Sequence, residues 1–226
     1  MAPTPDRTEL RAQLGNGLHQ LSVTINEQAT EQLVDYVLLL EKWNRVYNLT
    51  AVRDTSQMIG RHLLDSLSIL PWVTVSDASN ETTVSNPATD STVLDVGSGA
   101  GLPVLPLAIV RPDVPFLSVE SNGKKTRFQQ QALQELGIGN VQVKQSRIEA
   151  VQTKASVIVS RAFTAPEQFL TAVEKNCVSG SIVIVMLGQK ERMPSKLPVG
   201  FNLNELCELN VPYCEFPRHV AIVEKV

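Results

Sequence analysis

Three glycines at alternate positions, Gly97, Gly99 and Gly101, follow an apolar run that carries an acid at Asp95. Glycine lets a backbone turn sharply and approach a ligand closely, because no Cβ stands in the way. An apolar segment of helical length continues from Leu102, and the amides at the start of a helix face such a ligand. The pattern therefore predicts a buried strand, a tight ligand-binding loop and a helix.

Spacing separates this loop from other glycine loops. The dinucleotide fingerprint G-x-G-x-x-G would need its third glycine at the position of Leu102, and a phosphate-binding loop would close on Lys-Ser or Lys-Thr, which this loop lacks. The remaining pattern, D-x-G-x-G-x-G, resembles the first motif of Rossmann-like methyltransferases that use S-adenosyl-L-methionine. A strand-to-helix turn with a purely structural role is the alternative.

A second acid, Glu120, ends the next apolar run, residues 116–120. It follows the glycines by about 20 residues, the length of one strand-helix-strand unit. An acid at the carboxyl end of that strand lies beside the ligand and accepts hydrogen bonds from ribose hydroxyls. We therefore expect Glu120 to bind the ribose of a nucleoside cofactor.

The elements that position these residues alternate between strand and helix patterns. Strands are expected at residues 93–96, 116–120, 141–144, 157–161, 182–186, 206–211 and 220–223. Helices are expected at residues 104–110, 124–136 and 164–176. This alternation predicts an α/β fold with a mostly parallel seven-stranded sheet and helices on both faces.

The N-terminal part has helical patterns only. Leucines recur at helical spacing over residues 7–21, but Gly15 and Gly17 interrupt them, so we expect a frayed or broken first helix. A second helix should run from a cap at Asn26 to about residue 45. A third should start at a cap at Asp54 and stop at residue 71.

The third helix carries Arg61, His62 and Asp65 close together on one surface. They are either a functional cluster or a group that fixes this helix to the sheet.

Residues 76–91 are small and polar and cannot anchor a core. We therefore divide the chain into an N-terminal helical extension (1–75), a polar linker or loop (76–91) and a cofactor-binding methyltransferase domain (92–226).

Composition limits the class of protein. With 43% hydrophobic and 19% charged residues, the chain of 226 residues is typical of a globular protein. The net charge of −3 does not favour nucleic acid, but binding needs only a local basic face. The three cysteines lack metal-ligand spacing, and no apolar run is long enough for a membrane span. We expect no metal site, no membrane partner, and a soluble cytoplasmic monomer.

Several further sequence words occur in a characteristic order. They are Lys42-Trp43-Asn44 with Tyr47-Asn48-Leu49-Thr50, Arg61-His62-Leu63-Leu64-Asp65-Ser66-Leu67, Asp95 to Pro103, Gln145 to Glu149, Ser160-Arg161-Ala162-Phe163 and Arg218-His219. On these words the chain resembles the bacterial 16S rRNA guanine-N7 methyltransferases, also called glucose-inhibited division protein B. The resemblance implies the Rossmann-like class I methyltransferase fold, S-adenosyl-L-methionine as cofactor, and 16S rRNA of the small ribosomal subunit as substrate.

The same resemblance implies cofactor contacts beyond Asp95 and the three glycines. They fall on Leu102, Ile148, Glu149 and Arg161, with Glu120 where the family has an acid for the ribose. The chain departs from the family at Val104, where a glycine is common. A second departure is Lys190, which is displaced from the usual place of a lysine directly after the fifth strand.

Guanine N7 has a free lone pair, so its methylation needs no general base. Catalysis then depends on positioning the two reactants, which can lower the activation free energy by ~7 kcal/mol or more. Arg161, at the end of a strand, is the expected positioning residue, contacting the substrate or the cofactor carboxylate; a surface salt bridge is the alternative. Basic side chains that could contact RNA phosphates are Arg53, Arg61, Lys124, Lys125, Arg127, Arg218 and His219.

Two other functions fit the same patterns. A Rossmann-type methyltransferase could act on a small molecule or a protein instead of RNA. A non-catalytic module could bind RNA or a nucleotide without turnover.

Overall fold

The computed structural model describes residues 6–74, 92–161, 165–189, 193–194 and 196–226. The predicted linker, residues 76–91, and Lys190 lie outside the described residues.

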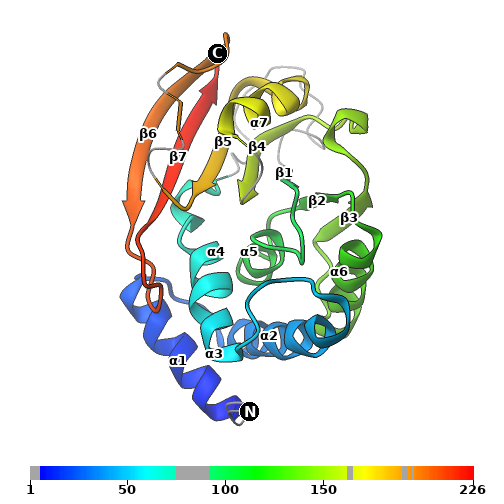
Figure 1. Cartoon of the computed structure of the whole chain (residues 1–226), viewed down its shortest axis with the longest axis vertical. Helices are drawn as coiled ribbons and strands as arrows, with labels where there is room; N and C mark the ends of the chain where they lie inside the picture. Colours follow the sequence, from blue (N-terminus) through cyan, green and yellow to red (C-terminus); the bar gives the residue numbers. More distant parts are fainter. Residues whose placement is uncertain (1–5, 75–91, 162–164, 190–192, 195) are drawn as a thin grey trace.

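The chain is built around a seven-stranded sheet (Figure 1). Its strands are β1 (Val93–Val96), β2 (Phe116–Glu120), β3 (Val141–Gln145), β4 (Ala155–Arg161), β5 (Cys177–Leu187), β6 (Phe201–Leu209) and β7 (Arg218–Lys225). They lie in the order β3-β2-β1-β4-β5-β7-β6. Strands β1 to β5 pair in parallel, and β7 pairs antiparallel with β5 and β6. This confirms the mostly parallel seven-stranded sheet that the sequence predicts.

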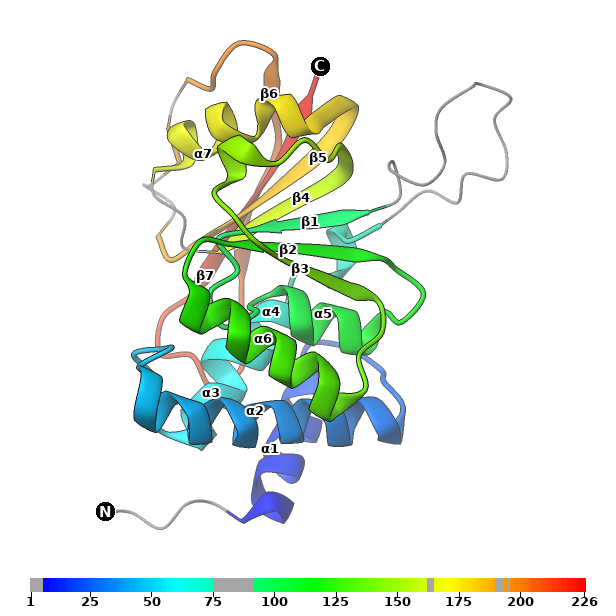
Figure 2. The same ribbon diagram turned by 90° about the vertical axis from the view of Figure 1, so that its right-hand side faces the viewer.

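Helices cover both faces of the sheet (Figure 2). Helices α5 (Val104–Val110) and α6 (Gly123–Leu136) lie on one face, and α7 (Pro166–Val173) lies on the other. Short 3-10 turns stand at Leu70–Trp72, Ile148–Ala150 and Glu174–Asn176. The N-terminal helices α1 (Arg7–Gln20) and α2 (Glu27–Tyr47) add a further layer beyond α5 and α6.

The first helix is continuous, so the prediction of a frayed or broken helix was wrong. Gly17 is buried, and a Cβ there would lie 2.3 Å from Leu64 Cδ1. The helix buries Leu10 and Leu14 completely. Tertiary packing therefore outweighs the low helix propensity of glycine, and Gly17 allows the close approach.

The third helical segment is less regular than predicted. It consists of α3 (Thr55–Met58), a π-turn (Ile59–Leu64) and α4 (Asp65–Leu67). The side chain of Asp54 accepts a hydrogen bond from Gln57 N–H at 3.1 Å, as expected of the cap. A π-turn widens the helix and is frequent at functional sites. Here it carries Arg61 and His62.

Strand β6 begins five residues before the predicted start at residue 206. It is an edge strand of the sheet, and its first half exposes polar side chains such as Asn202 and Asn204. The register with β7 also shifts between Leu203 and Glu205. Residues 201–204 do alternate between apolar and polar side chains, but the alternation is short, asparagine is depleted in strands, and the shift interrupts it, so pairing with β7 extends the strand.

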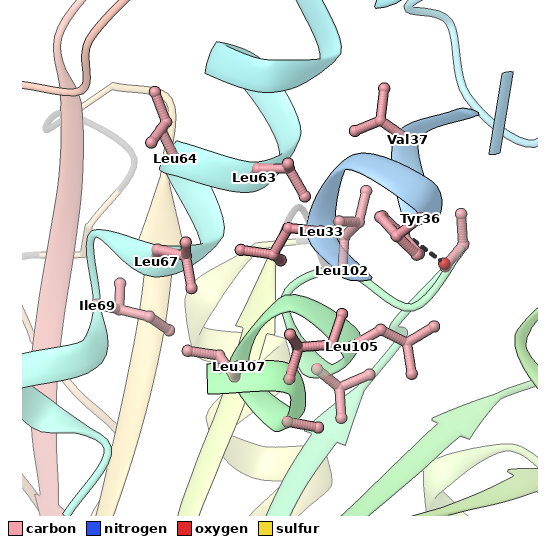
Figure 3. Packing of buried hydrophobic residues seen from close by; sticks show 14 of the residues in the cluster. Leu33, Tyr36, Val37, Leu63, Leu64, Leu67, Ile69, Leu102, Leu105 and Leu107 are labelled. Atoms are coloured by element: carbon pink, nitrogen blue, oxygen red, sulfur yellow. Dashed lines mark hydrogen bonds between the residues drawn. The ribbon is translucent and has the colours of Figure 1, made fainter. Parts of the chain in front are cut away.

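The extension and the sheet share one hydrophobic core. Leu33 of α2 and Leu63 of the π-turn are fully buried in the same cluster as Leu105 of α5 (Figure 3). The hydroxyl of Tyr36 donates a hydrogen bond of 2.8 Å to the carbonyl of Ala100. Helix α2 thus directly supports the glycine loop that follows β1.

Candidate functional site

The glycine loop takes backbone conformations that other residues rarely adopt. Gly97, Gly99 and Gly101 have φ of 73°, 60° and 87°. A Cβ at Gly101 would lie 2.6 Å from the Leu105 side chain, so this glycine lets the loop pack on α5. At Gly99 the nearest atom to an added Cβ is Lys125 Nζ, at 3.8 Å. The loop is therefore packed on its inner side and open at Gly99, as a ligand cradle requires.

Asp95 lies beneath this loop and is fully buried. Its Oδ2 accepts a hydrogen bond of 3.2 Å from the backbone N–H of Val104. Burial raises the pKa of the Asp95 carboxyl well above its usual range, and the Val104 N–H lowers it in part. Asp95 ties the start of α5 to β1, and it does not line the cleft described below.

Glu120 stands beside the loop, at the carboxyl end of β2, where the sequence predicts it. One carboxylate oxygen accepts from Gly99 N–H and the other from Asn122 N–H, each at 2.8 Å. The residue is only 7% exposed. A carboxylate offers about four acceptor positions, so its two hydrogen bonds to backbone amides are compatible with further bonds to ribose hydroxyls. The loop and Glu120 therefore fit a nucleoside-containing cofactor.

A cleft of about 480 Å³ opens between the carboxyl ends of the strands and the third helical segment. The glycine loop contributes Gly97, Ser98, Gly99, Ala100 and Leu102. The helical extension contributes Leu49 to Val52, Arg61, His62 and Asp65. The remaining lining residues are Lys125, Ser160, Arg161, Pro166, Phe169, Val185 to Gly188, Leu209, Arg218 and His219.

Asp65 connects the helical extension to two strands of the sheet. Its Oδ2 accepts from Arg161 Nη1 at 3.1 Å, and its Oδ1 lies 3.5 Å from Arg218 Nε. The Asp65 side chain is 7% exposed, against 21% for Arg161 and 25% for Arg218. Two guanidinium groups thus share one carboxylate. We call these three residues the Asp65 cluster, and it leaves the cleft locally positive although the chain is negative overall.

His62 is linked to Arg161 through a shared hydrogen-bond acceptor, the carbonyl of Arg61. Its Nδ1 lies 2.9 Å from the carbonyl of Arg61, which also accepts from Arg161 Nη1 at 3.0 Å. A carbonyl only accepts, so Nδ1 carries the hydrogen and Nε2 accepts from the Thr50 hydroxyl at 2.9 Å. Burial, and next the charge of Arg161, lower the pKa of His62 to about 3. His62 is therefore a neutral ring in a chain of hydrogen bonds from Thr50 to Arg161.

The structure brings together some of the predicted site residues and not others. Those that line the cleft are Gly97, Gly99, Leu102, Arg161, Arg61, Lys125, Arg218 and His219. Those outside its lining are Asp95, Gly101, Glu120, Ile148, Glu149, Arg53, Lys124 and Arg127. Of these, Ile148 is buried, and Glu149 is exposed on the 3-10 turn after β3.

Sequence reasoning did not place Thr50 at the site. It left His62 and Asp65 undecided between two roles. Their helical spacing was a signal, but their partners Arg161 and Arg218 lie far along the chain, so only the fold brings them together.

Among the described residues, no three His, Cys, Asp or Glu side chains are grouped to hold a metal ion. No helix in this part of the chain is long and apolar enough to cross a membrane.

Known proteins resemble this chain over nearly its full length. The family model of rRNA small subunit methyltransferase G matches residues 29–219. The ribosomal RNA small subunit methyltransferase G of Marinobacter nauticus is 42% identical over 216 residues, which cover 94% of each chain. The protein of the same name from Neisseria meningitidis serogroup C is 39% identical, covering 96% of this chain and 99% of that one.

A solved structure shares the fold. It is the SAM-dependent methyltransferase from Aquifex aeolicus, with a TM-score of 0.50 and 18% identity over 72% of this chain and 90% of that chain. The fold is therefore the Rossmann-like one of class I methyltransferases, as the sequence predicts.

Proposed function

The chain belongs to the family of rRNA small subunit methyltransferase G, and on that premise we propose that it transfers a methyl group from S-adenosyl-L-methionine to N7 of a guanine in 16S rRNA. The observation that carries the proposal is the cleft itself. One side of the cleft is lined by the glycine loop, which is hydrogen-bonded to the buried acid Glu120. The opposite side is lined by Arg161, which Asp65 holds in place.

The cofactor supplies an electrophilic methyl group on sulfur. In our proposal Gly97, Gly99 and Leu102 cradle it, Gly101 lets their loop pack on α5, and Glu120 accepts from its ribose hydroxyls. Asp95 supports this loop from below through Val104. Ile148 and Glu149 follow β3, the strand next to β2, and would border the adenine. Val104, where the family commonly has glycine, is fully buried against the core and does not line the cleft.

The substrate side needs alignment and no proton transfer. Guanine presents N7 and O6 together on one edge, and both are acceptors. N7 must stay free for the methyl group, so we assign O6 or the cofactor carboxylate to the Arg161 guanidinium. His62 fits a supporting role, since both of its ring nitrogens are already engaged within the protein. Arg161 is held at a fixed place by Asp65 and the Arg61 carbonyl, which is the preorganisation that positioning requires.

Basic side chains around the cleft would hold the RNA backbone. Arg61, Lys125, Arg218 and His219 line it, and Arg53 is exposed nearby with one hydrogen bond to Asn48. We propose that these contact phosphates, and that the exposed Lys124 and Arg127 of α6 extend the contact. Such contacts orient RNA without reading its sequence.

We also propose how the parts divide the work. Residues 1–75 form the wall that carries Arg61, His62 and Asp65, and residues 92–226 hold the cofactor. The protein would act as a monomer on the small ribosomal subunit, in the cytoplasm.

The test is methyl transfer with labelled cofactor. Wild-type protein is incubated with small subunits and, separately, with naked 16S rRNA, both from cells that lack the modification. Label should enter 16S rRNA, and cleavage at N7-methylguanine should map it to a single position. Label confined to proteins or small molecules would favour a methyltransferase of another substrate. Cofactor binding without any transfer would leave only a non-catalytic module.

A further inference from the structure

Exposed aromatic side chains occur in two segments that adjoin lining residues of the cleft in the sequence. Three aromatic residues are prominent among the large apolar side chains exposed in the described part of the chain: Tyr47, Tyr213 and Phe216, exposed by 43%, 46% and 69%. Tyr47 stands two residues before Leu49, which lines the cleft. Tyr213 and Phe216 stand in residues 210–217, which we call the rim loop. Single exposed apolar residues are ordinary, but two exposed aromatic residues on one short loop next to a cleft can form part of a binding surface.

The rim loop connects two residues of the cleft lining, Leu209 at the end of β6 and Arg218 at the start of β7. In Figure 1 this connection lies at the lower ends of β6 and β7. The loop that carries Tyr213 and Phe216 therefore adjoins the cleft lining at both of its ends.

The backbone of the rim loop is held against the π-turn. A Cβ at Gly60 would lie 2.9 Å from both Cβ and O of Tyr213, so the two segments touch directly. Val211 is 3% exposed, and Cys214 N–H donates to its carbonyl at 3.2 Å. Tyr213 keeps a φ of 62°, which a bulky residue rarely adopts outside a constrained site. The loop therefore presents its aromatic rings from an ordered backbone.

The charges next to these rings suit a polyanion. Arg218 begins where the rim loop ends, and Arg61 is exposed on the π-turn that the loop packs against. The acids nearby are Glu215, exposed on the loop itself, and Glu208, whose carboxylate lies 3.8 Å from His219 Nε2. Aromatic rings beside guanidinium groups are the surface on which unpaired bases stack while phosphates are neutralised.

The proposed reaction creates a need for such a surface. A cleft of about 480 Å³ is the size of a small-ligand pocket and admits a base but no duplex. The target guanine must therefore leave its stack, which exposes the face of a neighbouring base. An aromatic ring at the border of the cleft can replace the lost stacking.

We propose that Tyr213 and Phe216 form a stacking platform for an unpaired RNA base next to the target guanine. This inference rests on the proposed function. It adds a substrate-recognition surface, which is separate from the cofactor cradle and makes no contact with the reacting atoms.

The test uses matched variants of the most exposed ring. Phe216→Leu keeps an apolar side chain and removes the aromatic face, whereas Phe216→Trp keeps and enlarges that face. Val199→Ala removes another exposed apolar side chain, 92% exposed, from outside the cleft lining. KM for unmodified small subunits, kcat, and the dissociation constant for S-adenosyl-L-methionine are measured for all four proteins.

Phe216→Leu should raise KM for the subunits, and the loss of one fully stacked base corresponds to roughly 5- to 150-fold. The kcat and the cofactor affinity should change little. Phe216→Trp and Val199→Ala should keep the wild-type KM. A wild-type KM for Phe216→Leu, or an equal loss with Phe216→Trp, would overturn the inference. Absence of transfer by the wild-type protein would instead overturn the proposed function itself.

A second measurement identifies what the loop touches. Ultraviolet cross-linking of the wild-type protein to small subunits, followed by mass spectrometry, should yield a peptide containing residues 210–217 attached to a nucleotide. Attachment of this peptide to a ribosomal protein would show that the surface docks protein, and would overturn the assignment to RNA.

Discussion

His62 predicts a specific dependence of stability on pH. In the folded protein its ring is buried, bonded at both nitrogens and next to Arg161, and its pKa falls to about 3. In the unfolded chain the pKa returns to about 6.5. Above pH 6.5 the ring is neutral in both states, so it has no effect. Below pH 6.5 only the unfolded state takes up the proton, so the free energy of unfolding decreases as the pH falls towards 3.

The magnitude follows from the unfolded pKa. The pH of 5 lies about 1.5 units below the pKa of His62 in the unfolded chain. Each unit of this gap stabilises the unfolded state by about 1.36 kcal/mol. His62 should therefore lower the free energy of unfolding by about 2 kcal/mol between pH 8 and pH 5. This figure changes little if the folded pKa is 4 instead of 3, because the folded ring is neutral at pH 5 in either case.

The assay is urea unfolding at pH 8 and pH 5 for the wild type and for His62→Gln, whose amide does not titrate. The loss of stability between the two pH values should be about 2 kcal/mol smaller in the variant. His19→Gln, which changes an exposed histidine on α1, is the control and should behave as the wild type. Equal losses in the wild type and in His62→Gln would refute the neutral, buried role of His62.

Three further predictions concern other residues of the site. Arg161→Ala should abolish methyl transfer while the far-ultraviolet circular dichroism and the cofactor-free fold stay unchanged; wild-type turnover would remove Arg161 from the site. Glu120→Gln should weaken cofactor binding about 10-fold in calorimetry, because a charge-assisted hydrogen bond of about 1.5 to 3 kcal/mol is replaced by a neutral one of about 0.5 to 1.5 kcal/mol. Unchanged binding would exclude the ribose contact. Gly101→Ala should lower the free energy of unfolding by about 1 to 3 kcal/mol, because its Cβ would overlap Leu105 at a φ of 87°; an unchanged urea midpoint would contradict this packing.

Local patterns predicted the elements whose signals are local. The glycine spacing, the acid at the end of β2 and the strand-helix alternation each depend on neighbouring residues, and the sheet and the place of Glu120 follow from them. The continuity of α1 and the start of β6 could not be predicted in this way. The first depends on Gly17 meeting Leu64, and the second on pairing with β7.

The same limit applies to the site. Arg161 was predictable as a strand-end residue, but its fixation by Asp65 and the Arg61 carbonyl depends on a contact between the extension and the sheet. Asp95 illustrates the converse, since the motif marks it while the structure uses it to join β1 to α5. A sequence motif thus locates a site without separating the residues that touch a ligand from those that support the loop.

The most direct test of the proposed site is a crystal structure of the protein with S-adenosyl-L-homocysteine. We predict that the ribose hydroxyls lie within hydrogen-bond distance of Glu120, that the backbone of Gly97 to Gly99 contacts the ligand, and that its sulfur faces the part of the cleft lined by Arg161. A ligand bound away from the glycine loop, or one whose sulfur points away from Arg161, would contradict the proposed site.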